Sequence, residues 1–207
     1  LNQSLKKHGL WFPVDVSTAS RATIGGMTGN NSCGGKSLRY GKMRDNVLSI
    51  DAFLANGSKH HFGTQEIHTT GQYANISSDL LELGQREAHE IDARFPKLMR
   101  RVGGYNIDAL VPQNTPHNFA HMLVGSEGTL AYSSAIELKL WPLITEKVIG
   151  VCHFSTFYHA MDAAQHLVKL NPQGVGLIDS TMIALARDIP MFRQTIENFV
   201  TGDPEAL

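Results

Sequence analysis

Six glycines fall within residues 25–41 of this 207-residue chain, and no other feature restricts its fold as strongly. Glycine weakens helices and strands, because its backbone loses more conformational entropy on folding than that of other residues. We therefore predict a loop with special backbone angles, or backbone that lies against a ligand. Loops rich in backbone N–H groups and small polar side chains bind phosphates and other anions. A purely structural Ω-loop is the alternative.

Composition excludes several classes of protein. Hydrophobic residues make up 42% and charged residues 18%, which is enough apolar material for a packed core. The formal net charge of −1 argues against a nucleic-acid binder that neutralises phosphates. No apolar run approaches the roughly 18 residues of a transmembrane helix. Two cysteines cannot form a disulfide framework, which favours a cytoplasmic location.

Hydrophobic periodicity predicts a sheet with helices around it in the first part of the chain. Residues 46–54 are typical of a strand, Asn56-Gly57 of a hairpin turn, and residues 59–62 of the return strand. Residues 64–76 are polar and irregular, and a helix is expected from Ser78, with Ser78 or Asp79 as its N-cap, up to Pro96. A short helix at 118–124 and a strand at 135–141 complete this part.

The pattern changes near residue 145, where we predict a domain boundary between residues 1–145 and 146–207. An apolar run at 147–154, a helix at 156–169, a strand at 174–178 and a helix at 181–188 follow in β-α-β-α order. The first residue is not methionine, and we interpret the chain as a fragment of a longer protein.

Two near-matches to known motifs do not carry a function. Gly35-Lys36-Ser37 resembles the end of a phosphate loop, but Asn30 replaces its first glycine, no strand precedes it and Leu38 is not at a helix start. His117 and His121 have the i, i+4 spacing of metal ligands, but no third ligand is suggested. We predict neither a metal site nor a catalytic residue in this chain.

A more specific signal comes from two glycine motifs that lie about 90 residues apart. Residues 13–15, 22–34 and 39–41, together with Gly125-Ser126-Glu127-Gly128-Thr129-Leu130, resemble the second half of the FAD-binding domain of FAD-linked oxidases. This family includes vanillyl-alcohol oxidase, glycolate oxidase and D-lactate dehydrogenase. Residues 43–47, 104–106 and 179–183 are most similar to the large bacterial members, which join such an FAD module to an iron–sulfur module and oxidise D-2-hydroxyglutarate.

The resemblance implies an α+β fold: a second FAD-binding subdomain, with a mixed or antiparallel sheet flanked by helices, and the first β-α-β-α part of a ferredoxin-like substrate (cap) domain. It implies FAD as the cofactor and hydride transfer from C2 of a small D-2-hydroxy acid to the flavin, with an electron acceptor that the sequence does not identify. By family analogy the cofactor-binding residues are Pro13, Asp15, Thr23, Ile24, Gly25, Gly26, Asn30, Asn31, Ser32, Gly34, Gly125, Glu127 and Gly128.

The same resemblance implies that other parts of the site lie outside these residues. The pyrophosphate loop of the first FAD subdomain is expected before Leu1, and the substrate-binding residues and the 4Fe-4S cysteines after Leu207. We therefore expect the isolated chain to bind FAD weakly and to turn over nothing. A non-catalytic nucleotide- or phosphate-binding module, or a scaffold with the same fold, is the alternative. The presence of Gly25, Gly26, Gly34 and Gly128 counts against it.

Overall fold

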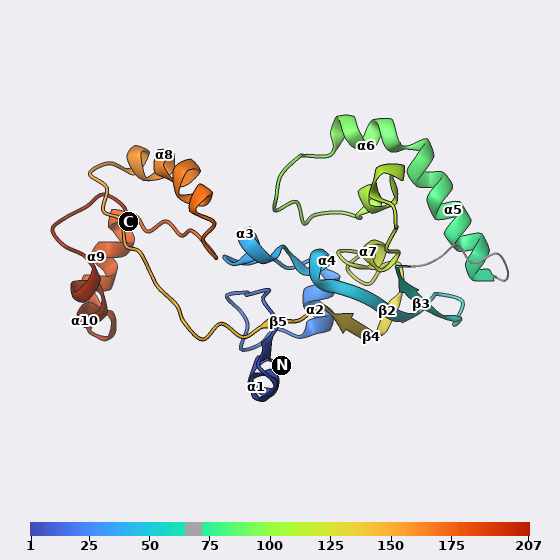
Figure 1. Ribbon diagram of the computed structural model, residues 1–207, viewed down its shortest axis with the longest axis horizontal. Coiled ribbons are helices and arrows are strands. Elements are labelled where there is room, and N and C mark those ends of the chain that lie inside the picture. The colour runs from blue at the N-terminus through green and yellow to red at the C-terminus, as the bar shows by residue number, and fades with distance from the viewer. Residues whose placement is uncertain (65–71) are drawn as a thin grey trace. The chain divides into compact units, whose positions relative to one another are not determined.

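The computed structural model describes residues 1–64 and 72–207 and divides into two compact units, Leu1–Leu143 and Ile144–Leu207 (Figure 1). Each unit has its own internal packing and is described by itself.

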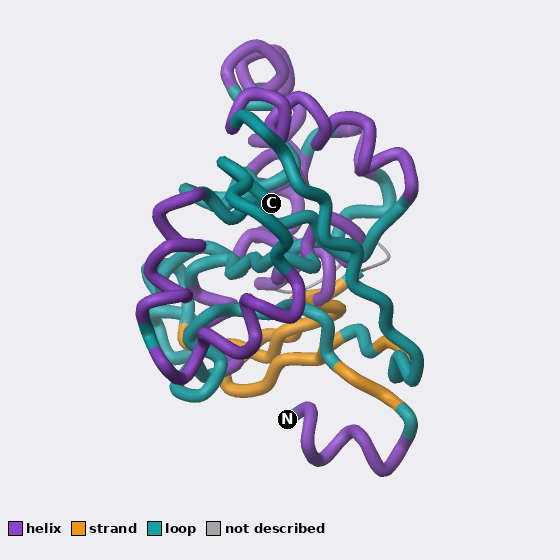
Figure 2. The backbone as a smooth tube through the Cα atoms, turned by 90° about the vertical axis from the view of Figure 1, so that its left-hand side faces the viewer, coloured by secondary structure: helices purple, strands orange, loops and turns teal. Residues whose placement is uncertain are grey.

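The sheet of the N-terminal unit is antiparallel and has β2 (Val47–Phe53) between β3 (Lys59–Gly63) and β4 (Tyr132–Leu138). Figure 2 shows the strands in orange. Ile50 of β2 lies opposite Phe62 of β3 and Ile136 of β4. The predicted hairpin at Asn56-Gly57 is confirmed, and β4 begins three residues earlier than predicted. A second antiparallel pair joins β1 (Leu10–Trp11) to β5 (Trp141–Pro142). Helices and antiparallel strands thus combine as expected for the first part of the chain.

Several short helices accompany this sheet, and one longer pair of helices, α5 and α6, lies between β3 and β4 in the sequence (Figure 1). The helices are α1 (Asn2–Leu5), α2 (Ile24–Gly29), α3 (Ser37–Tyr40), α4 (Met43–Asn46), α5 (Gln72–Arg86), α6 (Ala88–Arg94) and α7 (Ala120–Leu123), with 3₁₀ turns η1 (Lys6–His8), η2 (Ile107–Leu110) and η3 (Pro112–Asn114).

Helix α5 starts earlier than the sequence predicted. It begins at Gln72, so Ser78 and Asp79 lie inside it and do not cap it. Its Leu80 and Leu81 pack against the hydrophobic core, and this tertiary contact supports the polar first turns that local propensity does not favour. Of the segment predicted to be irregular, residues 65–71 lie outside the described part of the chain.

The glycine-rich segment also differs from its prediction. Residues 24–29 form the α-helix α2 and not a loop. Two interactions offset the poor helix propensity of its three glycines: Thr23 Oγ1 accepts a hydrogen bond from the Gly26 N–H at 3.0 Å, and Met27 is buried in the core. The prediction that no helix starts after Lys36 was wrong as well, because α3 begins at Ser37.

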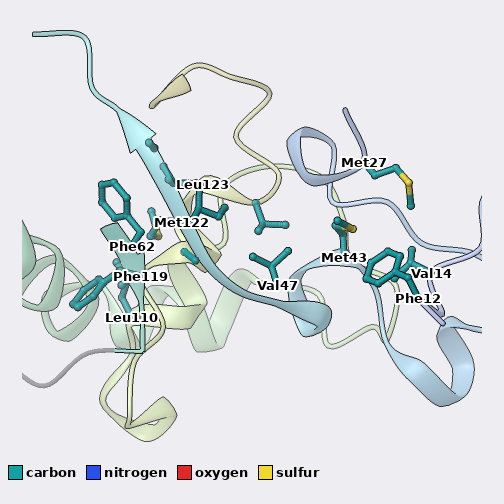
Figure 3. Close-up of a cluster of buried hydrophobic side chains, with 14 residues drawn as sticks. Phe12, Val14, Met27, Met43, Val47, Phe62, Leu110, Phe119, Met122 and Leu123 are labelled. Atoms are coloured by element: carbon teal, nitrogen blue, oxygen red, sulfur yellow. The ribbon is translucent and has the colours of Figure 1, made fainter. Parts of the chain in front are cut away.

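The hydrophobic core connects the sheet to the glycine-rich segment (Figure 3). Phe12 and Met43 gather near Met27 at one end of this cluster, and Phe62 packs near Leu110 at the other. Met43 and Ile50 are fully buried. The core therefore fixes α2 relative to β2, and it places the segment that resembles a cofactor loop on a rigid support.

The C-terminal unit contains α8 (Phe157–Leu167), η4 (Val168–Leu170), α9 (Ser180–Asp188) and α10 (Pro190–Phe199). The helices predicted at 156–169 and 181–188 are confirmed, whereas the segments 147–154 and 174–178 do not form strands. Among the described residues, isolated bridges alone join Ala206 to Phe154 and to Asp179. Val148 is 96% exposed, because this unit offers no neighbouring strand in its described residues to pair with the apolar run. The ferredoxin-like arrangement is therefore not seen here.

Candidate cofactor site

The two glycine motifs meet in space. The backbone N–H of Gly125 donates to the Thr28 carbonyl at 2.9 Å, and the N–H of Glu127 donates to the Gly29 carbonyl at 3.0 Å. Gly29 lies directly against the second motif, since a Cβ on it would be 4.0 Å from the Glu127 Cα. The C-terminal end of α2 and the loop 125–128 thus form one continuous surface from segments that lie far apart in the sequence.

Six of the thirteen predicted cofactor-binding residues are exposed at this surface or at the start of α2. These are Thr23, Gly25, Gly26, Asn30, Glu127 and Gly128. The first turn of an α-helix leaves backbone N–H groups without intrahelical acceptors, and such groups attract anions. The N–H groups of Gly26, Asn30 and Glu127 already donate within the chain, so the other polar groups of this exposed set are the ones available to an external ligand.

The contacts and backbone angles of the chain do not explain the presence of glycine at position 25. A Cβ there would meet no atom within 4 Å, and its φ is not in the left-handed region. A glycine in a helix costs about 1 kcal/mol relative to alanine. Packing and backbone conformation therefore do not require glycine at this position, whereas close approach of a ligand to the main chain would. This open surface fits the backbone contacts that FAD would need.

Three predicted residues, Pro13, Asn31 and Gly125, are buried by the chain itself. The side chains of Pro13 and Asn31 are covered by other parts of the protein. Asn31 adopts φ 52° and accepts the Arg44 N–H on its Oδ1 at 3.0 Å, while its Nδ2 has no partner. These residues support the surface from behind.

The other four predicted residues, Asp15, Ile24, Ser32 and Gly34, are half-buried. Asp15 Oδ1 accepts the Lys36 N–H at 3.0 Å, and its Oδ2 lies 3.6 Å from Lys36 Nζ. A Cβ on Gly34 would overlap the Asp15 carbonyl oxygen. These contacts hold the loop 30–36 against the segment that carries Asp15. They also engage Lys36, as expected if it is not a phosphate-loop lysine.

Ile24 and Ser32 have different roles from Asp15 and Gly34. Ile24 packs against the core, and Ser32 Oγ donates to Asn30 Oδ1 at 2.6 Å. Ile24 therefore helps to orient α2, and Ser32 restrains the side chain of the exposed Asn30.

A charged cluster next to this surface was not predicted. Arg44 Nη1 lies 2.7 Å from Asp108 Oδ2, and Arg101 pairs with the other oxygen of the same carboxylate. Burial alone would raise the pKa of Asp108, but the hydrogen bonds and charges of Arg44 and Arg101 lower it. Burial lowers the pKa of Lys42, whose Nζ donates to the Arg101 carbonyl at 2.9 Å. The only signal in the sequence was that residues 43–47 and 104–106 take part in the family resemblance.

No metal centre is assembled by the residues that the structure describes: none of their histidines, cysteines and carboxylates form a group of three. Burial, with the nearby charge of Arg44, lowers the pKa of His121 to about 4. His117 Nδ1 lies 3.2 Å from the Ala109 carbonyl. Within the same part of the chain, no helix is both long and apolar enough to cross a membrane.

Comparison with known proteins agrees with the motifs. Residues 1–63 match the FAD binding domain family. Over 99% of its length the chain is 31% identical to a D-2-hydroxyglutarate dehydrogenase of Pseudomonas putida and 29% identical to that of Escherichia coli, and it covers 21% of each. A probable mitochondrial D-lactate dehydrogenase of Danio rerio is 28% identical over 82% of the chain and 25% of that protein.

A solved structure of alkyldihydroxyacetonephosphate synthase is also similar, with a TM-score of 0.53, 19% identity, and coverage of 89% of this chain and 25% of the other. That likeness shows the fold. Residues 1–63 are thus similar to an FAD binding domain, and the chain as a whole is similar to D-2-hydroxyglutarate and D-lactate dehydrogenases. The chain spans about a fifth of the length of the D-2-hydroxyglutarate dehydrogenases that it matches.

Proposed function

We propose that this chain forms one side of the FAD site in an oxidoreductase that acts on a small D-2-hydroxy acid of the D-2-hydroxyglutarate or D-lactate type. The observation that carries the proposal is the joined surface of α2 and the loop 125–128, with Gly25 open toward its outside. The activities for which the relatives are named support the substrate class.

The residues exposed at this surface would hold FAD through backbone and small polar groups. The start of α2, at Thr23, Gly25 and Gly26, would face the flavin or the pyrophosphate, and Glu127 with Gly128 would close the far side near the adenosine or ribityl end. When bound, FAD supplies the acceptor for the hydride that leaves C2 of the substrate. The protein binds and orients the cofactor, and it excludes competing reactions.

We place two further functions outside these residues. An iron–sulfur cluster needs four thiolate ligands, and the chain has two cysteines. The groups that bind the substrate carboxylate also belong, on this proposal, to other parts of a complete protein, consistent with the fifth of the relatives' length that this chain covers. The electron acceptor is external to this site.

The test is the visible absorption spectrum of the complete protein that contains these residues. We expect a flavin spectrum that bleaches on anaerobic addition of D-2-hydroxyglutarate or D-lactate, with the L-enantiomers as matched controls. A colourless protein that cannot be reconstituted with FAD would refute the proposal in favour of a phosphate-binding or scaffold module. A flavin that no D-2-hydroxy acid reduces would refute the substrate class alone.

A further inference from the structure

Two asparagines lie directly behind the joint between α2 and the loop 125–128. Asn31 and Asn106 are both completely buried. Gly125 sits between them: a Cβ on Gly125 would lie 3.3 Å from the Asn31 Cβ and 3.5 Å from Asn106 Nδ2. Gly125 also has a φ of 83°, which a side chain would strain. The path of the loop is therefore determined from the inside of the molecule.

Asn106 connects this loop to the charged cluster. Its Nδ2 donates to the carbonyl of Val124 at 2.7 Å and to that of His121 at 3.2 Å, just before the loop begins. Its Oδ1 accepts from Arg44 Nη1 at 3.2 Å and from Arg101 Nη2 at 3.3 Å. Because both ends of the amide are engaged, only one orientation of the side chain satisfies the network.

Arg44 contacts both asparagines. Its guanidinium donates to Asn106 Oδ1, and its backbone N–H donates to Asn31 Oδ1 at 3.0 Å. The side chains of Arg44 and Arg101 are 17% and 12% exposed, and both guanidiniums pair with the carboxylate of Asp108. Loss of one partner of a largely desolvated ion pair strongly destabilises a protein, because the other charge is left buried and unpaired. Few other side chains are therefore tolerated at these positions.

We propose that Arg44, Arg101, Asn106 and Asp108 are positioning residues for the cofactor site. They hold the loop 125–128 in register with the end of α2, so that two separate segments act as one rigid wall. They do so from behind, through Asn31, Asn106 and the Val124 carbonyl. The consequence for FAD affinity rests on the proposed function, whereas the restraint on the loop does not.

Asn106→Asp tests the contacts of Asn106 with the backbone carbonyls separately from its contacts with the two arginines. The carboxylate keeps acceptors for Arg44 and Arg101 but loses the N–H donors to Val124 and His121, and it places a negative oxygen against their carbonyls. In the complete apoprotein, we expect amide hydrogen exchange at Gly125 and Glu127 to accelerate at least tenfold, while exchange in β2 stays within twofold of wild type. We expect the FAD dissociation constant to rise at least tenfold.

Asp51→Asn is the matched control. It removes a carboxylate of β2 that lies 2.7 Å from His61 Nδ1 and 3.7 Å from Lys59 Nζ, so that its ion pairs stay within the β2–β3 hairpin. It should leave loop exchange and FAD affinity unchanged. Arg101→Lys, which keeps the charge but loses the planar guanidinium, serves if Asn106→Asp does not fold, and it should accelerate loop exchange at least threefold.

Three results of the hydrogen-exchange measurement would overturn the inference: loop exchange at the wild-type rate in the network variants, equal acceleration in the loop and in β2, or the same acceleration in Asp51→Asn. Faster loop exchange with unchanged FAD affinity would show that the network restrains the loop without positioning the cofactor, and it would also overturn the assigned role. If the wild-type protein binds no FAD, the proposed function fails, and the assigned role at a cofactor site fails with it; loop exchange then still reports whether the network restrains the loop.

Discussion

Gly25 and Gly34 illustrate two opposite reasons for a glycine at a ligand-binding surface. A Cβ on Gly34 would overlap the Asp15 carbonyl oxygen, so glycine is required there by the chain's own packing. A Cβ on Gly25 would meet nothing within 4 Å. The Gly34 position therefore affects stability, and the Gly25 position affects what approaches from outside.

This contrast leads to paired expectations for alanine. Gly34→Ala should lower the free energy of unfolding by about 3 kcal/mol, the upper range for overpacking. Gly25→Ala should raise it by up to about 1 kcal/mol, because alanine favours the helix, while weakening FAD binding. Urea denaturation of the apoprotein and FAD titration measure the two quantities. An unchanged FAD affinity in Gly25→Ala would contradict the cofactor-facing position of α2.

At the scale of elements, the β2–β3 hairpin is the part in which local sequence and structure agree most closely. Gly57 has φ 81° in the turn, Ser58 N–H donates to Asn56 Oδ1 at 3.0 Å, and the strands pair in register from Phe53 with Lys59. A non-glycine residue in the left-handed region costs about 1–2 kcal/mol. The turn is therefore a local determinant of the sheet that carries the site.

Gly57→Ala should destabilise the protein by about 1 kcal/mol, because alanine resists the positive φ. The matched control is Gly103→Ala, since Gly103 also has open space around it but does not have a positive φ. Thermal unfolding of both variants checks this expectation. A loss of equal size in Gly103→Ala would show that the backbone angle at Gly57 is not the cause.

Helix α2 shows the limit of local reasoning. Three glycines in six residues predict a loop, yet burial of Met27, the Thr23 cap and two backbone hydrogen bonds from the loop 125–128 hold the segment as a helix. The hydrogen bonds from the loop come from residues distant in sequence. The strands predicted at 147–154 and 174–178 are absent for a related reason. A strand is stable only when it pairs with a neighbouring strand, and hydrophobic periodicity does not show whether such a neighbour exists.

At the scale of the whole molecule, stability should depend on pH through His121. Burial lowers its pKa from 6.5 to about 4, so the folded protein keeps the ring neutral while the unfolded chain binds a proton below pH 6.5. The contribution of the neutral, buried His121 ring to the free energy of unfolding is complete above pH 6.5 and is lost as the pH falls toward 4. Its full size is roughly 3 kcal/mol by proton linkage.

His121→Gln should therefore flatten the decline in unfolding free energy between pH 6.5 and 4. The control is His89→Gln on α6, where the side chain is 93% exposed. Urea midpoints measured across this pH range for both variants and wild type test the expectation. If the unfolding free energy of His121→Gln falls with decreasing pH as steeply as that of wild type, His121 is not buried in solution as described.

The sequence by itself determined the hairpin, the central strand, the helices that form α8 and α9, and the two glycine motifs, because turn chemistry and periodicity are local. It also indicated a resemblance to FAD-linked oxidases, and hence FAD as the expected cofactor. Only the tertiary structure decided which motif residues face outward: Thr23, Gly25 and Glu127 are exposed, whereas Pro13 and Asn31 are buried.

The tertiary structure alone also revealed the charged cluster behind the loop. Arg44 and Asp108 are 64 residues apart in sequence, and nothing in their neighbours marks them as a pair. Burial and ion pairing arise from contacts between distant segments, which folding creates and no local pattern encodes. For the same reason the joint between α2 and the loop 125–128 exists only in the folded protein.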